Sequence, residues 1–193
     1  YQELDPGIHP RSIAIVSQSG GLLIGMINRA ASRRLPIRLF VSSGNEAVTG
    51  VEDYLEALVD DPGLKVIAVI VEGLADLDRL VAAGRRAAAN GKRVALLKLG
   101  RSALGRRAVG AHTGRDPGDD EALMAALFEA DIAYFERPDE LIEFCQLTSR
   151  YSKPPGPRVS AIMVSGGASA LISDIGARRG VPFAKWSGAT IDG

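Results

Sequence analysis

Short apolar runs alternate with longer segments of helical pattern along the first 150 residues, and this alternation limits the fold more than any other feature. The apolar runs predict five strands, at residues 12–17, 37–42, 66–71, 93–98 and 132–135. The run VIAVIV at 66–71 is continuous and β-branched, as in a strand covered on both faces. The remaining segments predict helices at residues 20–34, 50–60, 76–90, 119–130 and 138–151. This order predicts a parallel, doubly wound α/β sheet.

A stiff segment, KPPGP at residues 153–157, is the clearest domain boundary in the chain. It follows a leader at residues 1–10 and a first domain at residues 11–152. Residues 158–193 then open with a strand, a Ser-Gly-Gly turn and a helix ending in Arg-Arg, which repeats the pattern at the start of the first domain. We expect these residues to be the beginning of a second, similar α/β domain that is cut off at Gly193, because so short a stretch is not enough for a parallel domain.

The composition excludes several classes of protein. Lys plus Arg and Asp plus Glu both count 23, and this neutrality argues against nucleic acid or an anionic membrane surface as a partner. The single cysteine, Cys145, rules out an internal disulfide framework and fits a reducing compartment. The polar start, YQELDPGIHPRS, is not a targeting peptide, and no apolar run has the length of a membrane span. We therefore expect a cytoplasmic protein.

Two loops with small or polar residues follow the first two predicted strands, at the edge where parallel sheets carry their functional sites. The first, Ser17-Gln18-Ser19-Gly20-Gly21, lets backbone N–H groups approach an anion at a helix start, but it equally fits a tight turn with Ser19 as an ordinary N-cap. It is neither a Walker A loop nor a dinucleotide fingerprint. The second, Ser43-Gly44-Asn45-Glu46, is by itself better explained as a plain turn.

Two further segments hold the remaining candidate residues. Glu72 directly follows the apolar run 66–71, where a carboxylate is costly unless it has a partner such as a histidine; a solvated loop glutamate is the alternative. The stretch Gly100–Gly118 contains five glycines, four arginines and His112, and is predicted to be a long loop. The chain has two histidines, and His9 lies in the leader, so His112 is the candidate nitrogen nucleophile, with a surface histidine as the alternative.

Other chemistries have weaker support. One cysteine and two distant histidines give no ligand spacing for a metal, so no metal site is predicted. The G-x-S-x-G pattern of a serine hydrolase does not occur at the first turn. Tyr54, Met124 and Phe128 recur at helical spacings and are expected in the core.

Five segments in order, IAIVSQSGGL, SSGNEA, VIVEGL, LLKLGRS and GAHTG, resemble the second domain of the NDP-forming acyl-CoA synthetases. The likeness extends from about Arg11 to Tyr151, and the part from Arg158 resembles the opening of the next domain in that family. The family includes the α-subunit of succinyl-CoA synthetase, and the fold that it implies is flavodoxin-like, in agreement with the pattern of strands and helices.

The resemblance implies a reversible reaction in which an acid, CoA and ATP or GTP give acyl-CoA, NDP and phosphate through a phosphohistidine. His112 matches the phosphorylated residue, and Glu72 matches the carboxylate that orients it. The helix start that holds the phosphoryl group matches Ser17, Ser19, Gly20 and Gly21. The loop on the side of the acid substrate matches Gly44, Asn45, Glu46, Thr113 and Gly114.

The resemblance also implies partners. The preceding CoA-binding domain and the ATP-grasp domain of the family, on the same chain or on another subunit, are not found in this sequence. We therefore expect a fragment that binds no cofactor alone, in an oligomeric enzyme that uses CoA, ATP or GTP and Mg. The main alternative is a non-catalytic regulatory module fused to a protein acyltransferase, in which the histidine is typically lost. A flavodoxin-like FMN binder is a weaker alternative, because aromatic residues are only 5% of the chain.

Overall fold

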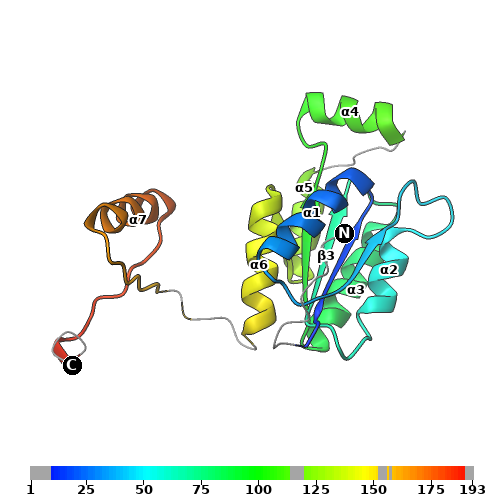
Figure 1. Cartoon of the computed structure of the whole chain (residues 1–193). Coiled ribbons are helices and arrows are strands. Elements are labelled where there is room, and N and C mark those ends of the chain that lie inside the picture. The colour runs from blue at the N-terminus through cyan, green and yellow to red at the C-terminus, as the bar shows by residue number, and fades with distance from the viewer. Residues whose placement is uncertain (1–9, 114–119, 152–155, 157, 190–193) are drawn as a thin grey trace. The chain divides into compact units, whose positions relative to one another are not determined.

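A computed structural model describes residues 10–113, 120–151, 156 and 158–189. The chain divides into two compact units, Tyr1–Ser152 and Lys153–Gly193 (Figure 1). Five strands of the first unit form a parallel sheet in the order β2-β1-β3-β4-β5, which is the flavodoxin-like order. These strands are β1 (Ile13–Ser17), β2 (Ile37–Ser42), β3 (Val66–Val71), β4 (Arg93–Lys98) and β5 (Ile132–Phe135). The predicted α/β sheet is thereby confirmed, with its strands within one residue of their predicted bounds.

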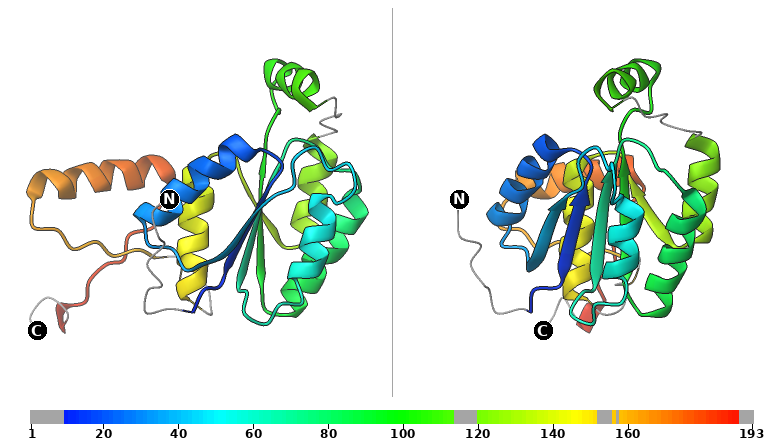
Figure 2. Two further views of the ribbon diagram at one scale, coloured as in Figure 1. Left: turned by 45° about the vertical axis from the view of Figure 1, so that its right-hand side comes forward. Right: turned by 90° about the vertical axis from the view of Figure 1, so that its right-hand side faces the viewer.

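Five helices of the first unit cover the two faces of this sheet (Figures 1 and 2). One face is covered by α1 (Gly20–Ser32) and α6 (Pro138–Arg150). The other is covered by α2 (Val51–Leu58), α3 (Leu77–Ala89) and α5 (Asp120–Glu129). Every residue of β1 and β3 is buried, because each of these strands lies between two neighbours and two helical layers.

A sixth helix of this unit, α4 (Ala103–Thr113), departs from the prediction of a long loop over Gly100–Gly118. Figure 2 shows α4 beyond the edge of the sheet, outside both helical layers. The segment ALGRRAVGAHT contains two glycines, but its alanine, leucine and arginine residues favour helix strongly enough to outweigh them. The prediction of a loop was wrong for these eleven residues.

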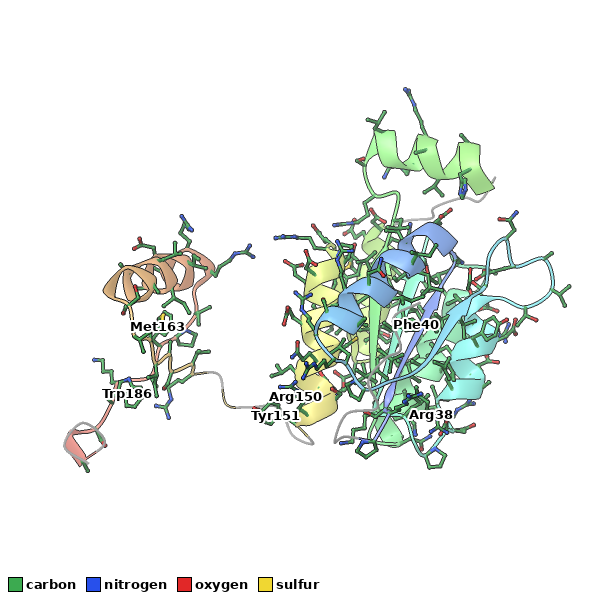
Figure 3. The ribbon with its side chains drawn as sticks, in the orientation of Figure 1. Arg38, Phe40, Arg150, Tyr151, Met163 and Trp186 are labelled. Atoms are coloured by element: carbon green, nitrogen blue, oxygen red, sulfur yellow. The ribbon has the colours of Figure 1, made fainter. Side chains whose placement is uncertain are left out.

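Two hydrophobic clusters, one on each face of the sheet, make up the core. Tyr54 packs against the cluster under α2, α3 and α5, as expected. Met124 and Phe128 were expected there too, but their exposed fractions are 39% and 88%, so that prediction was wrong. On α5 the buried positions are Leu123 and Leu127, and the helix therefore turns the other two side chains away from the sheet. The second cluster includes Cys145 and is flanked by Phe40 of β2, which is labelled among the side chains in Figure 3.

The second unit contains helix α7 (Gly166–Arg179), which begins after Ser165 and ends at Gly180 in the left-handed conformation. Val159 and Phe183 form an isolated parallel bridge, and the Phe183 ring lies against Gly176. Met163 and Trp186, labelled in Figure 3, belong to this unit. The predicted helix is present after Ser165, but the strand predicted before it is reduced to the single bridge at Val159. That this unit is the beginning of a second α/β domain stays a prediction.

Candidate functional site

The turn between β1 and α1 is built from short serine hydrogen bonds. The Ser17 hydroxyl is buried; it accepts from the Ser19 amide at 3.1 Å and donates to the Ser19 carbonyl at 2.9 Å. The Ser19 hydroxyl caps α1 by accepting from the Leu22 amide at 3.3 Å. Gly20 and Gly21 open the helix at an exposed position, and a Cβ at either would meet no atom closer than 3.6 Å. The start of α1 is therefore exposed, as a helix N-terminus that binds an anion must be.

The loop after β2 holds a carboxylate at the same edge of the sheet. Gly44 has a φ of +60°, and Glu46 has the left-handed φ of +55° that is rare for a residue with a side chain. The Glu46 carboxylate accepts from the Ser43 hydroxyl at 2.7 Å and from the Gln18 amide nitrogen at 2.9 Å. These two donors fix Glu46 in its strained conformation and bring the loop against the β1–α1 turn.

Glu72 follows β3 and is buried, with 5% of its surface exposed. Its backbone N–H donates to the Gln18 side-chain oxygen at 2.5 Å. Its carboxylate oxygen Oε2 is buried and has no hydrogen-bond partner among the residues that the structure describes. A buried carboxylate oxygen without a donor is costly, so this position favours the approach of a group that carries a proton. The alternative of a solvated loop glutamate is therefore wrong.

Such a group stands nearby on α4. The Nδ1 atom of His112 lies 3.6 Å from Oε2 of Glu72, while 71% of the His112 side chain is exposed. This distance is longer than a hydrogen bond, and less than 1 Å of closure would make it one. The other ring nitrogen, Nε2, is then left for reaction. The structure thus brings together the two residues that the sequence suggested as a pair.

Gly100 and Val109 set the position of α4. Gly100 has a φ of +74°, and a Cβ there would lie 2.7 Å from Cγ2 of Val109. Val109 is the residue of α4 that is buried, at 7% exposure, whereas most other side chains of this helix are exposed. Val109 is thus the point at which α4 packs closely against the segment that follows β4, and we expect this contact to influence the position of His112.

Lys98 is a residue of the site that the sequence analysis missed. It is the last residue of β4 and is buried, with 4% of its surface exposed. Its ammonium group donates to the carbonyl oxygens of Glu72 and Leu99, each at 3.1 Å. The signal was in the sequence: a lysine that ends an apolar strand at the edge carrying Glu72 has a buried charge that needs acceptors.

The remaining predicted positions are less informative. Asn45 is exposed in the β2 loop, Thr113 is the last residue of α4, and Gly114 lies outside the described residues. Within the described ranges, the His, Cys, Asp and Glu residues form no group of three or more that could hold a metal ion. No helix in this part of the chain is both long enough and apolar enough to cross a membrane.

Residues 10–148 match the family of the succinyl-CoA ligase-like flavodoxin domain. The chain belongs to this family. It is 35% identical over 165 residues to a trans-feruloyl-CoA synthase from an unknown prokaryotic organism, an alignment that covers 86% of this chain and 23% of that protein. It is 30% identical over 179 residues to the ADP-forming acetate–CoA ligase I of Archaeoglobus fulgidus, covering 93% and 26% of the two chains.

A solved structure gives the same result for the fold. The dinucleotide-forming acetyl-coenzyme A synthetase 1 of Candidatus Korarchaeum cryptofilum, in complex with phosphate and ADP, superposes with a TM-score of 0.79 at 26% identity. The superposition covers 94% of this chain and 39% of that one. The chain thus spans well under half the length of these relatives and is an acyl-CoA synthetase-like module of the succinyl-CoA ligase-like family.

Proposed function

We propose that the chain is the phosphoryl-carrying domain of an NDP-forming acyl-CoA synthetase, with His112 as the carrier. The observation that supports this most directly is the closeness of an exposed imidazole to a buried carboxylate oxygen, Oε2 of Glu72, that has no hydrogen-bond partner among the described residues. A regulatory module without catalysis would not need this pair, and the carrier function is therefore the better explanation.

The geometry suggests how the histidine reacts. A proton on Nδ1 directed at Glu72 leaves the lone pair on Nε2, which attacks the terminal phosphorus of the nucleoside triphosphate. The Nε2–P bond forms, the bond from that phosphorus to the bridging oxygen breaks, and NDP leaves. The ring gains positive charge, which the Glu72 carboxylate balances. The phosphoryl group then passes to the acid, giving an acyl phosphate, and the CoA thiol displaces phosphate from it to form acyl-CoA.

The start of α1 is suited to the negative charge of the phosphoryl group. Ser17 and Ser19 hold the turn rigid through their own hydrogen bonds, so Gly20 and Gly21 can offer backbone N–H groups at the positive end of the helix dipole. Donors that are already in place lose nothing in reorganisation when the charge arrives. We assign these four residues to the phosphoryl group and Gly44, Asn45, Glu46, Thr113 and Gly114 to the side of the acid substrate.

The proposed reaction also needs binding sites for CoA and for the nucleotide. CoA and Mg-ATP or Mg-GTP would bind to a CoA-binding domain and an ATP-grasp domain, on the same chain or on another subunit of an oligomeric enzyme. The relatives described above are named for different acids, ferulate and acetate, so the acid is assigned only as a carboxylic acid. Calorimetric titration of the 193-residue chain alone should give weak binding of CoA or nucleotide, or none; micromolar affinity for CoA would show that it holds a CoA site of its own.

The test uses the full-length protein and radiolabelled Mg-ATP and Mg-GTP. His112→Ala should abolish both the label and acyl-CoA formation, whereas His9→Ala, at the only other histidine of the chain, should abolish neither. The label should be labile in acid and stable in base, unlike phosphoserine, and ³¹P NMR should place it on Nε2. Full labelling of the His112→Ala variant would show that the carrier lies elsewhere.

A further inference from the structure

The side-chain amide of Gln18 lies between the two carboxylate-bearing segments of the site. Gln18 is 6% exposed. Its oxygen accepts from the backbone N–H groups of Glu72 at 2.5 Å and Gly73 at 3.2 Å. Its nitrogen donates to the Gly73 carbonyl at 2.8 Å and to Oε2 of Glu46 at 2.9 Å. One side chain therefore binds both the peptide of Glu72 and the carboxylate of Glu46.

The chemistry of these contacts accounts for a glutamine at this position. Two backbone N–H groups require an acceptor on one side, and a carbonyl and a carboxylate require a donor on the other, which fixes the orientation of the amide. A carboxylate at position 18 would oppose Glu46, and an ammonium group would leave the two N–H groups without an acceptor. A neutral group that donates and accepts is what both neighbours need in a buried site.

We propose that Gln18 is a positioning residue that couples the loop carrying Glu46 to Glu72, and through Glu72 to His112. This inference rests on the proposed function, because it concerns the rate at which His112 is phosphorylated. Glu46 has a left-handed conformation, and its carboxylate accepts from the Gln18 amide and from the Ser43 hydroxyl. A shift of the loop therefore pulls on the Gln18 amide, and the same amide holds the Glu72 peptide whose carboxylate faces His112.

A reciprocal exchange of the two groups separates this role from a merely structural one. Gln18→Glu keeps the size of the side chain and its acceptor for Glu72, but it removes the donor and places a carboxylate against Glu46. We expect the labelling rate of His112 to fall about 10-fold to 10²-fold, as for a catalytic group displaced by about 1 Å. Glu46→Gln in the same protein restores a donor and an acceptor between the two side chains in reversed order, and it can still accept from Ser43. The donor to the Gly73 carbonyl stays lost, so the double variant should recover part of the lost rate.

Asn90→Asp is the matched control. The Asn90 amide nitrogen also donates to a carbonyl and a carboxylate, those of Val59 and Asp60 at 3.0 and 3.3 Å, but at the end of α3 away from the site. This variant should change the melting temperature without changing the labelling rate. If Gln18→Glu does not fold, Gln18→Met is used instead: it should slow labelling, and Glu46→Gln should then have no further effect, because the coupling is already lost.

The outcomes distinguish the two hypotheses. Labelling of the Gln18 variant at the wild-type rate, or a double variant no better than the product of the single effects, would overturn the coupling while the carrier function stands. If the wild-type protein itself takes no label on His112, the proposed function fails, and the coupling fails with it.

Discussion

The Nδ1 atom of His112 and the Oε2 atom of Glu72 lie 3.6 Å apart, with the imidazole exposed and the carboxylate buried. The two residues belong to different elements: Glu72 follows the central strand β3, and His112 belongs to the peripheral helix α4. The carboxylate is therefore fixed by the core, and the histidine is the partner that can move. This asymmetry suits a residue that must receive a phosphoryl group at one place and deliver it at another.

Replacing Glu72 by Gln tests the role of its charge. The amide keeps the size of the side chain, but it can donate to Nδ1 and so favours the tautomer with the proton on Nε2. We expect phosphorylation of His112 to slow by about 10²-fold or more, in the range for loss of a positioned acid–base partner, with the fold retained. Rapid-quench labelling of the full-length protein measures this rate.

Glu52→Gln is the control for the loss of a buried carboxylate. The Glu52 side chain accepts from the backbone N–H groups of Ala75 and Asp76 at 2.8 and 3.1 Å. Its replacement should lower the melting temperature and leave labelling close to the wild-type rate. Equal rates for the Glu72 variant and the wild type would show that the carboxylate does not orient the histidine.

Lys98 supports Glu72 from the opposite side to Gln18. Lys98→Met removes the donor to the Glu72 and Leu99 carbonyl oxygens and also a positive charge at the edge of the sheet that carries Glu72. We expect slower labelling by about 10-fold or more, because the Glu72 peptide loses a fixed partner. Lys92→Met is the control: Lys92 is also buried, at 7% exposure, but it precedes β4 at the other edge of the sheet. If both variants slow labelling equally, the effect of Lys98 is one of stability alone.

The sheet could be predicted because each strand has a local signal in the sequence, a short run rich in apolar residues. The runs at β2, β3, β4 and β5 were predicted with their observed bounds, and the reason is clearest for β3, a strand covered on both faces whose six residues are all apolar and buried. The neighbourhood of Glu72 and the β1–α1 turn followed from topology, because the carboxyl ends of parallel strands share one edge. The structure therefore agrees with the predicted neighbourhood of these residues, while their catalytic roles stay predictions.

The features that the sequence did not reveal depend on contacts between distant residues. The helix α4 depends on the summed helix propensity of its residues and on one contact, that of Val109 with Gly100. The number of glycines in this stretch had instead predicted a loop. The hydrogen bonds of Gln18 to Glu72 and Glu46 span 54 and 28 residues. Neither Gln18 nor Glu46 carries a local sequence pattern that distinguishes it from an ordinary turn residue. The side-chain geometry was therefore needed to find the contact between them.

The anchor of α4 can be tested by filling the space beside Gly100. Gly100→Ala introduces a Cβ that would lie 2.7 Å from Val109 in a residue with a φ of +74°. The clash should displace α4 and with it His112, so both stability and labelling should fall. Gly91→Ala is a close control, because Gly91 has a φ of +70° but nothing within 4 Å of the added Cβ. It should cost about 1–2 kcal/mol of stability from backbone strain and leave labelling unchanged. If both variants are labelled at the wild-type rate, the Val109 contact does not position His112.

Arg79 joins α3 to α2 and makes the packing of these helices sensitive to acid. Its guanidinium lies 2.7 Å from carboxylate oxygens of both Asp53 and Glu56, and these hydrogen bonds hold the pKa of each carboxyl group below its usual value. A carboxyl group with a lowered pKa in the folded state stabilises the fold above its unfolded pKa, and this contribution is lost as the pH falls through the folded value.

Arg79→Met should therefore lower the melting temperature at pH 7, and the difference from the wild type should shrink as the pH falls below about 4, where the carboxyl groups of the unfolded chain are protonated. Arg85→Met removes a more exposed pair, with Glu129 at 3.3 Å, and should have little effect at any pH, as is usual for surface ion pairs. Thermal denaturation from pH 7 to pH 3 makes the comparison. A difference between the Arg79 variant and the wild type that is constant over this range would mean that Arg79 acts by packing its aliphatic stem, because that contribution does not depend on the charge of the two carboxylates.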